Sequence, residues 1–276
     1  MLKNKAILVG LTIKCWAGRI KDKEVTSKVD NMYDAKNAGL YTKRLVTSDN
    51  LSGITTLNSR LRDYFYQKSL PWGNNGARIM LSSVFIEFMK AVSQYNSNLE
   101  REINKFKAAY PDIMASAQER LGDLYNPDEY PKLSELSELF GASVDATPIA
   151  DDDDFRLDIN PEELEELKEL YRSTVQQNAV NAQTHVLTLV SQELEKIKSK
   201  LADPDTRITV NLFNSLRSMV ESYSKMAIFD PDIMSAKLND ISFNLFDVDI
   251  HSLRMSEDYR NEVIADIDAH LDALNG

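Results

Sequence analysis

Alternation of apolar and polar positions predicts a strand near the start of the chain. Residues 6–16 read AILVGLTIKCW, and the side chains of Val9, Leu11, Ile13 and Cys15 share one face of an extended backbone. All four are apolar, so we expect this face to be buried, with Cys15 as a core thiol. The sequence therefore predicts a short β-containing region at the N-terminus.

Two short helices are predicted to follow. Residues 23–37 place apolar side chains close to a spacing of three or four, and residues 49–66 begin after a capping Ser48. The apolar positions are Val25, Val29, Met32 and Tyr33 in the first helix, and Ile54, Leu57, Leu61 and either Tyr64 or Phe65 in the second. The glycine- and asparagine-rich turn at 71–76 is followed either by a third strand or by the start of the next helix.

The middle of the chain carries a heptad-like hydrophobic seam. Its members are Phe85, Phe88, Val92, Tyr95, Leu99 and Phe106. Glu102 occupies the one polar seam position. We expect this helix to end at Tyr110, because Pro111 follows, and shorter helices to start at Pro111 and to cover residues 133–140. A seam of this kind is buried either within the chain or between copies, so self-association is expected.

A longer helix is predicted to begin at residue 161. Asn160 is a capping residue, Pro161 suits the first helical position, and no breaker appears before Asp203. The apolar track changes phase along it, from Leu164, Leu167 and Tyr171 to Leu187, Val190, Leu194, Ile197 and Leu201. The phase change predicts a kink or a new packing partner, and Asn178, Asn181 and His185 lie where the first track would continue. We favour an exposed polar strip there over a strip that faces a ligand.

These elements predict a mainly α protein of the α+β class. A small N-terminal β-containing segment would be followed by a bundle of long amphipathic, coiled-coil-like helices. We expect a basic α+β segment at 1–82, a helical segment at 83–150 and an acidic long-helix bundle at 151–276, with 83–276 as one helical domain the alternative. The acidic run Asp151–Asp154 marks the best internal boundary as a solvated loop.

Charge is divided unevenly between the two ends of the chain. Residues 1–110 carry 18 Lys and Arg against 9 Asp and Glu, a net +9, whereas residues 111–276 carry 14 against 34, a net −20, which together give the total of −11. The single cysteine excludes a disulfide scaffold and a multi-cysteine zinc site. No apolar run approaches the roughly 20 residues of a membrane-spanning helix, so a cytoplasmic protein is expected.

Basic residues near the N-terminus are candidates for contact with nucleic acid or with an acidic partner. They are Lys14, Arg19, Lys21, Lys23, Lys43, Arg44, Arg60 and Arg62. The alternative is that they face the acidic helices of their own chain. No phosphate-binding loop, dinucleotide fingerprint, zinc-protease motif or nucleophile elbow occurs in the sequence. We therefore expect no catalytic, cofactor-binding or metal-binding residues, and no cofactor.

Three stretches carry a family resemblance: LVGLTIKCWAGRIKD at 8–22, PWGNNGARIML at 71–81 and LGDLYNPDEYPKLSELSELFGASVDATPI at 121–149. In these the chain resembles an uncharacterised family from phages and other mobile elements, classed as a domain of unknown function. Its members are often encoded near a MoxR-type AAA+ ATPase and a von Willebrand A-domain protein. The resemblance implies a phage accessory or adaptor protein in the bacterial host cytoplasm, and it transfers no catalytic residues.

The functional expectation is a non-enzymatic protein that acts through protein–protein interaction. The resemblance makes an AAA+ ATPase one candidate for the partner protein, and the protein is expected to self-associate and to bind no membrane. The alternative is a nucleic-acid-binding protein that uses the basic N-terminal segment to hold single-stranded DNA or RNA.

Overall fold

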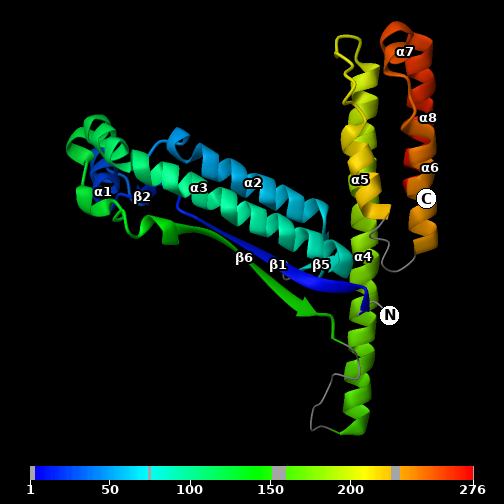
Figure 1. Ribbon diagram of the computed structural model, residues 1–276, viewed down its shortest axis with the longest axis horizontal. Coiled ribbons are helices and arrows are strands. Elements are labelled where there is room, and N and C mark those ends of the chain that lie inside the picture. The colour runs from blue at the N-terminus through cyan, green and yellow to red at the C-terminus, as the bar shows by residue number, and fades with distance from the viewer. Residues whose placement is uncertain (1–3, 74–75, 151–159, 225–230, 276) are drawn as a thin grey trace. The chain divides into compact units, whose positions relative to one another are not determined.

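The computed structural model describes residues 4–73, 76–150, 160–224 and 231–275, and it shows a mainly α chain with a small sheet (Figure 1). The chain forms two compact units. Unit 1 comprises Met1–Gly10, Tyr66–Glu87 and Asp145–Gly276, and unit 2 comprises Leu11–Phe65 and Phe88–Val144. This division differs from the three consecutive segments predicted from the sequence, because each unit is assembled from separate stretches. The acidic run at 151–154 lies outside the described residues.

The sheet has the strand order β4 (Leu70–Pro71), β5 (Arg78–Leu81), β1 (Ala6–Cys15) and β6 (Phe140–Pro148). Strands β1 and β5 are antiparallel, with Ala6 opposite Leu81 and Val9 opposite Arg78. The stretch after the turn at 71–76 forms both predicted elements in succession, because β5 leads directly into helix α3 (Ser82–Leu121). Cys15 is exposed, so its assignment to the core is wrong. The reason is that the buried residues of β1, Ala6 and Val9, lie in the first half of the strand.

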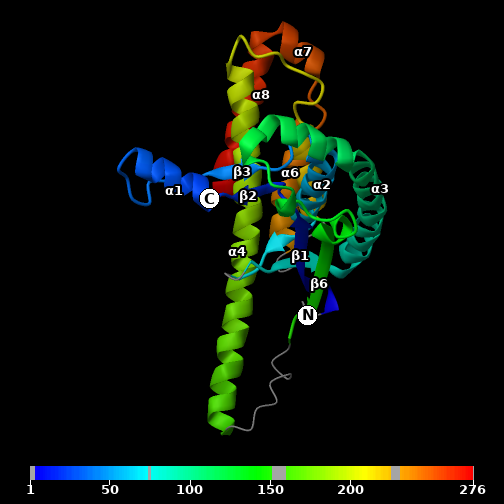
Figure 2. The same cartoon turned by 90° about the vertical axis from the view of Figure 1, so that its left-hand side faces the viewer.

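Unit 1 is built mainly from five helices: α4 (Pro161–Ala202), α5 (Asn214–Ser224), α6 (Pro231–Leu245), α7 (Ile250–Met255) and α8 (Glu257–Asn275). Helices α4 and α8 lie side by side in both views (Figures 1 and 2). The predicted cap of α4 is confirmed, because Oδ1 of Asn160 accepts a hydrogen bond from the Glu162 amide at 2.9 Å. Pro161 occupies the first turn, as expected.

Burial along α4 follows the predicted change of phase. Its buried side chains are Ala179, Ala182, Val186, Val190, Leu194, Ile197 and Leu201, and none precedes Ala179. The second apolar track therefore packs in the core of unit 1, while Leu164, Leu167 and Tyr171 are only half-buried. Asn181 is exposed, and Asn178 and His185 are half-buried. Burial and the positive charge of Arg78 lower the pKa of His185.

Unit 2 holds β2 (Arg19–Lys21), α1 (Lys23–Met32), β3 (Thr42–Arg44), most of α2 (Ser52–Gln67) and most of α3 (Ser82–Leu121). The buried side chains of α3 are Phe88, Val92, Tyr95, Leu99, Ile103, Phe106, Tyr110, Ile113 and Ala117. Five of the six predicted seam residues are thus buried inside the chain, and Phe85 is half-buried. Ile103 rather than Glu102 fills the next seam position, so the steps of four and three continue without a gap.

The helix end predicted at Tyr110 and the separate helix predicted at 133–140 are both wrong. Helix α3 continues through Pro111 to Leu121, and the buried side chains Tyr110 and Ile113 on either side show that packing outweighs the cost of the proline. Residues 133–140 form a 3₁₀ turn at Leu136–Leu139 and then enter β6 instead of forming a helix. The Phe140 ring packs edge-on against Phe106, with centroids 6.2 Å apart, which favours the extended path.

Candidate functional site

Residues 19–44 form a small lobe of unit 2, which we call the α1 lobe. Strands β2 and β3 pair antiparallel, with Arg19 opposite Arg44, and α1 connects them. Helix α1 is capped by Asp22, whose Oδ1 accepts a hydrogen bond from the Val25 amide at 3.0 Å. Figure 2 shows α1 extending to one side of the two strands. The lobe thus presents a short helix on a minimal two-stranded base.

A buried lysine secures the base of the lobe. The Nζ atom of Lys43, whose residue is 3% exposed, lies 3.2 Å from Oδ2 of Asp22 and 2.7 Å from Oε2 of Glu129. It also donates a hydrogen bond to the Leu124 carbonyl at 2.9 Å. Burial alone would lower the pKa of Lys43, but the two carboxylates outweigh it and raise the pKa. This ion-pair cluster, the Lys43 clamp, joins the lobe to the segment that follows α3.

The chain on either side of the lobe is also fixed by hydrogen bonds. The amides of Leu45 and Val46 donate to the Gly18 carbonyl at 2.8 and 3.1 Å. Gly18 has φ of +62°, and a Cβ there would lie 2.2 Å from Cγ2 of Val46, so the position requires glycine. The Tyr130 hydroxyl donates to the Leu45 carbonyl at 3.0 Å. The lobe is therefore held mainly through backbone hydrogen bonds and charge.

Several apolar side chains of the lobe are exposed. Helix α1 has no buried residue: Val25 is half-buried, Val29 is exposed, and Met32 and Tyr33 are 78% and 73% exposed. The large exposed hydrophobic residues are Ile20, Val29, Met32, Tyr33, Leu40 and Tyr41, which we call the lobe patch. The helix predicted at 23–37 is observed as α1, but none of its side chains is buried.

The predicted basic residues are distributed over several places. Arg19, Lys21, Lys23 and Arg44 are exposed on the lobe, whereas Lys14 and Arg62 are exposed on β1 and α2. The prediction that Lys43 contacts an external partner is wrong, because its ammonium group is buried inside the Lys43 clamp. The sequence could not show this, because Glu129 is far away along the chain.

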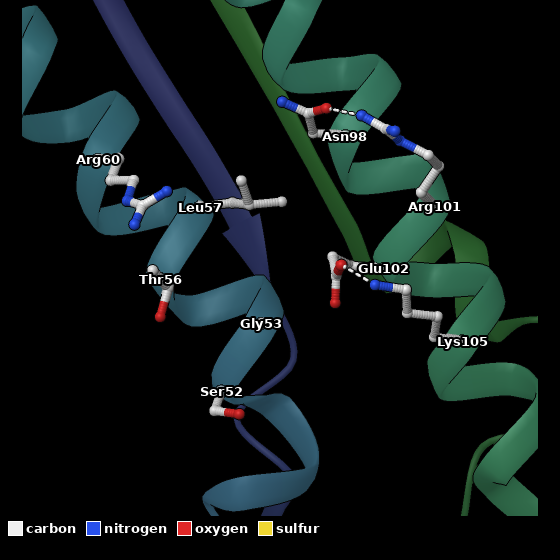
Figure 3. A pocket seen from close by; sticks show the side chains of 9 residues that line it. All are labelled: Ser52, Gly53, Thr56, Leu57, Arg60, Asn98, Arg101, Glu102 and Lys105. Carbon is white, nitrogen blue, oxygen red and sulfur yellow. Dashed lines mark hydrogen bonds and ion pairs between the residues drawn. The ribbon is translucent and has the colours of Figure 1, made fainter.

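Arg60 lies in a second feature of unit 2, a polar groove of about 560 Å³ between α2 and α3 (Figure 3). Arg101 and Lys105 line it from α3, and Ser52 and Thr56 add hydroxyl groups from α2. Sequence reasoning missed the two α3 cations. Their spacing of four residues, which places them on one helix face, was the available signal.

The charges of this groove are only partly neutralised. Lys105 pairs with Glu102, with 2.7 Å between Nζ and Oε1, and Arg101 donates a hydrogen bond to Asn98. Arg60 makes no ion pair or hydrogen bond with any residue that the structure describes. The α2/α3 groove therefore offers a net positive, hydroxyl-lined surface that suits a phosphate or carboxylate group.

Within the ranges given above, no group of three or more His, Cys, Asp or Glu side chains could hold a metal ion. No helix in the described part of the chain is both long enough and apolar enough to cross a membrane. Comparison of the chain with protein-family models, curated proteins and solved structures finds no match.

Proposed function

We propose that this protein is a non-enzymatic adaptor that binds a partner protein through the α1 lobe. The lobe patch is the observation that carries this proposal. The transfer of apolar side chains out of water is favourable, and folding leaves the side chains of the lobe patch partly or mostly in solvent. Such a concentration of large exposed hydrophobic residues within residues 19–44 is typical of an interaction surface.

The charges around the patch indicate the chemistry of the partner. Arg19, Lys21, Lys23 and Arg44 are exposed on the same lobe, so a partner surface with carboxylates around apolar side chains would be complementary. The resemblance to the phage family names an AAA+ ATPase as the first protein to test. Binding to a second copy is the competing outcome, since residues 111–276 are strongly acidic.

A site-specific crosslink tests the proposal. A photo-crosslinking amino acid is placed at Tyr33, and at Phe243 as the control, because Phe243 is an exposed aromatic residue of unit 1. We expect one discrete partner to be crosslinked from position 33 in cells that express the protein, and not from position 243. Equal crosslinking from both positions would contradict the proposal, and a crosslink only to a second copy would replace the adaptor role with self-assembly.

Affinity measurements with the purified partner complete the test. Replacing two patch residues together, Met32→Ser and Tyr33→Ser, is expected to weaken binding about tenfold or more, because exposed aromatic and large apolar residues dominate interface energies. Phe243→Ser should leave the affinity unchanged. An unchanged affinity in the patch variant would rule out the lobe as the binding surface.

Nucleic-acid binding is the second candidate function, and the α2/α3 groove favours it. The cations Arg60, Arg101 and Lys105 line one groove and could follow a phosphate backbone. Fluorescence anisotropy with labelled single-stranded DNA and RNA at low salt tests this. Arg60→Gln is expected to weaken binding and to reduce the salt slope by about 1, whereas the control Arg172→Gln on α4 should not. Absence of binding at low salt would exclude this function.

A further inference from the structure

Three arginines of unit 1 converge on one hollow of about 350 Å³. Arg207 comes from the connection between α4 and α5, Arg254 from α7, and Arg260 from the start of α8. The C-terminal end of α4, helix α7 and the start of α8 lie at the same end of the helical bundle in both views (Figures 1 and 2). Residues that are distant in the sequence are thus brought together by the bundle, so this arginine pocket could not be recognised from spacing.

Two of the guanidinium groups are fixed by backbone carbonyls. Nε of Arg254 donates to the Ile208 carbonyl at 2.9 Å, and Nη1 of Arg260 donates to the Leu253 carbonyl at 3.0 Å. Each bond uses one of the five N–H donors of an arginine and leaves the others for a ligand. Because the side chains are already held, less conformational entropy is lost when an anion binds.

The three arginines lack carboxylate partners among the residues that the structure describes. No ion pair there involves Arg207, Arg254 or Arg260. The one carboxylate that lines the pocket, Asp203, accepts hydrogen bonds from the Thr206 hydroxyl at 2.7 Å and from the Asp205 amide at 3.0 Å.

The surrounding sequence makes this arrangement unusual. Residues 111–276 contain 34 Asp and Glu against 14 Lys and Arg, so carboxylates are abundant in this part of the chain. Three guanidinium groups nevertheless surround a hollow that only one carboxylate lines. Formal charges of +3 and −1 give the lining a net charge of +2.

We propose that the arginine pocket binds a phosphate monoester group. A monoester carries a charge of about −1.5 to −2 at neutral pH, which matches the net charge of the lining. Planar guanidinium groups bind phosphate oxygens in pairs, and several donors from different directions suit a tetrahedral anion better than a planar carboxylate. The hollow leaves room for a small organic group beside the phosphate. A phosphorylated side chain and a small phosphorylated metabolite both supply this chemistry.

Isothermal titration calorimetry on the full chain tests the site with inorganic phosphate. Arg207→Gln is the informative variant, because no described hydrogen bond holds Arg207 in the fold. Arg172→Gln is the matched control on α4, where Arg172 pairs with Glu165 and Glu169. We expect one phosphate per chain, an affinity about tenfold lower in Arg207→Gln, and no change in Arg172→Gln.

Further titrations identify the source of the phosphate. Tighter binding of a phosphoserine peptide than of glucose 6-phosphate would support the site and indicate a phosphorylated protein, and the reverse order would support it and indicate a metabolite. Chloride at matched ionic strength should produce no binding heat. The proposal is overturned if phosphate does not bind, if chloride reproduces its effect, or if Arg207→Gln binds phosphate as the unmodified protein does. These outcomes are independent of the α1 lobe.

Discussion

The seam of buried side chains along α3, which packs against α2, and the α1 lobe belong to the same unit but are held in place by different forces. In the seam, Phe88 is fully buried, and its ring lies 6.2 Å from Tyr64 and 5.5 Å from Phe65. In the lobe, α1 buries no side chain, and Lys43 joins it to Glu129 through charge. Hydrophobic burial therefore stabilises one region, while hydrogen bonds and ion pairs hold the other.

This difference shows which apolar residues serve the fold. Every large apolar side chain removed from water in the seam contributes about 1.5–3 kcal/mol to folding. In the lobe patch, Met32, Tyr33 and Leu40 contribute little in this way, because they are 68–78% exposed. The apolar side chains of α3 are buried and serve the fold, whereas under the proposed function those exposed on α1 serve binding.

Removing the Phe88 ring is expected to have the largest effect on stability. Phe88→Ala creates a cavity between α2 and α3 and should lower the free energy of unfolding by about 3–5 kcal/mol. Urea denaturation followed by circular dichroism measures the change. Met89→Ala, at the neighbouring exposed position, is the control and should change it little. Similar losses in both variants would contradict the assignment of the seam as the core.

Removing the Lys43 ammonium group should have the next largest effect, and it should be local. Lys43→Ala leaves the carboxylates of Asp22 and Glu129 without their cation, at a cost of about 3 kcal/mol. Hydrogen exchange should accelerate in residues 19–44 and remain slow in α3. Lys28→Ala removes only an exposed ion pair with Glu24 and should have almost no effect. Equal acceleration in the lobe and the seam would show that the clamp supports the whole unit.

Lowering the pH should also destabilise the α1 lobe before α3, because protonation of Asp22 weakens the Lys43 clamp. The hydrogen bond from the Val25 amide, followed by the interaction with Lys43, lowers the pKa of Asp22. A lowered pKa in the folded state adds stability above the ordinary pKa of 3.8, and this stability is lost as the pH falls through the folded value. Protection factors of lobe amides should therefore decrease below about pH 4, before those of α3.

The variant Asp22→Asn provides the control for the acid experiment. It removes the titrating group but retains a side-chain oxygen that can accept the Val25 hydrogen bond. The pH dependence of lobe protection should be weaker in this variant. Simultaneous loss of protection in the lobe and the seam of the unmodified protein would indicate a general acid effect and not titration of Asp22.

Local sequence patterns predicted where helices form better than they predicted which residues come into contact in the folded chain. The steps of three and four in α3 and the cap at Asn160 are local signals, and both correspond to observed helices. The path through Pro111 depends on the burial of Tyr110 and Ile113, which the sequence does not show. The same limit applies to the candidate sites, because Lys43 meets Glu129 and Arg207 meets Arg254 only after folding.

The smallest expected effect gives the sharpest comparison between the two regions. Met32→Ser combined with Tyr33→Ser removes two large apolar side chains, as Phe88→Ala removes one. Because both are mostly in water, the free energy of unfolding should change by no more than about 0.5 kcal/mol. The same urea denaturation measures it. A loss of more than about 1 kcal/mol would mean that the folded chain itself buries these side chains, and the lobe patch would then be core and not a binding surface.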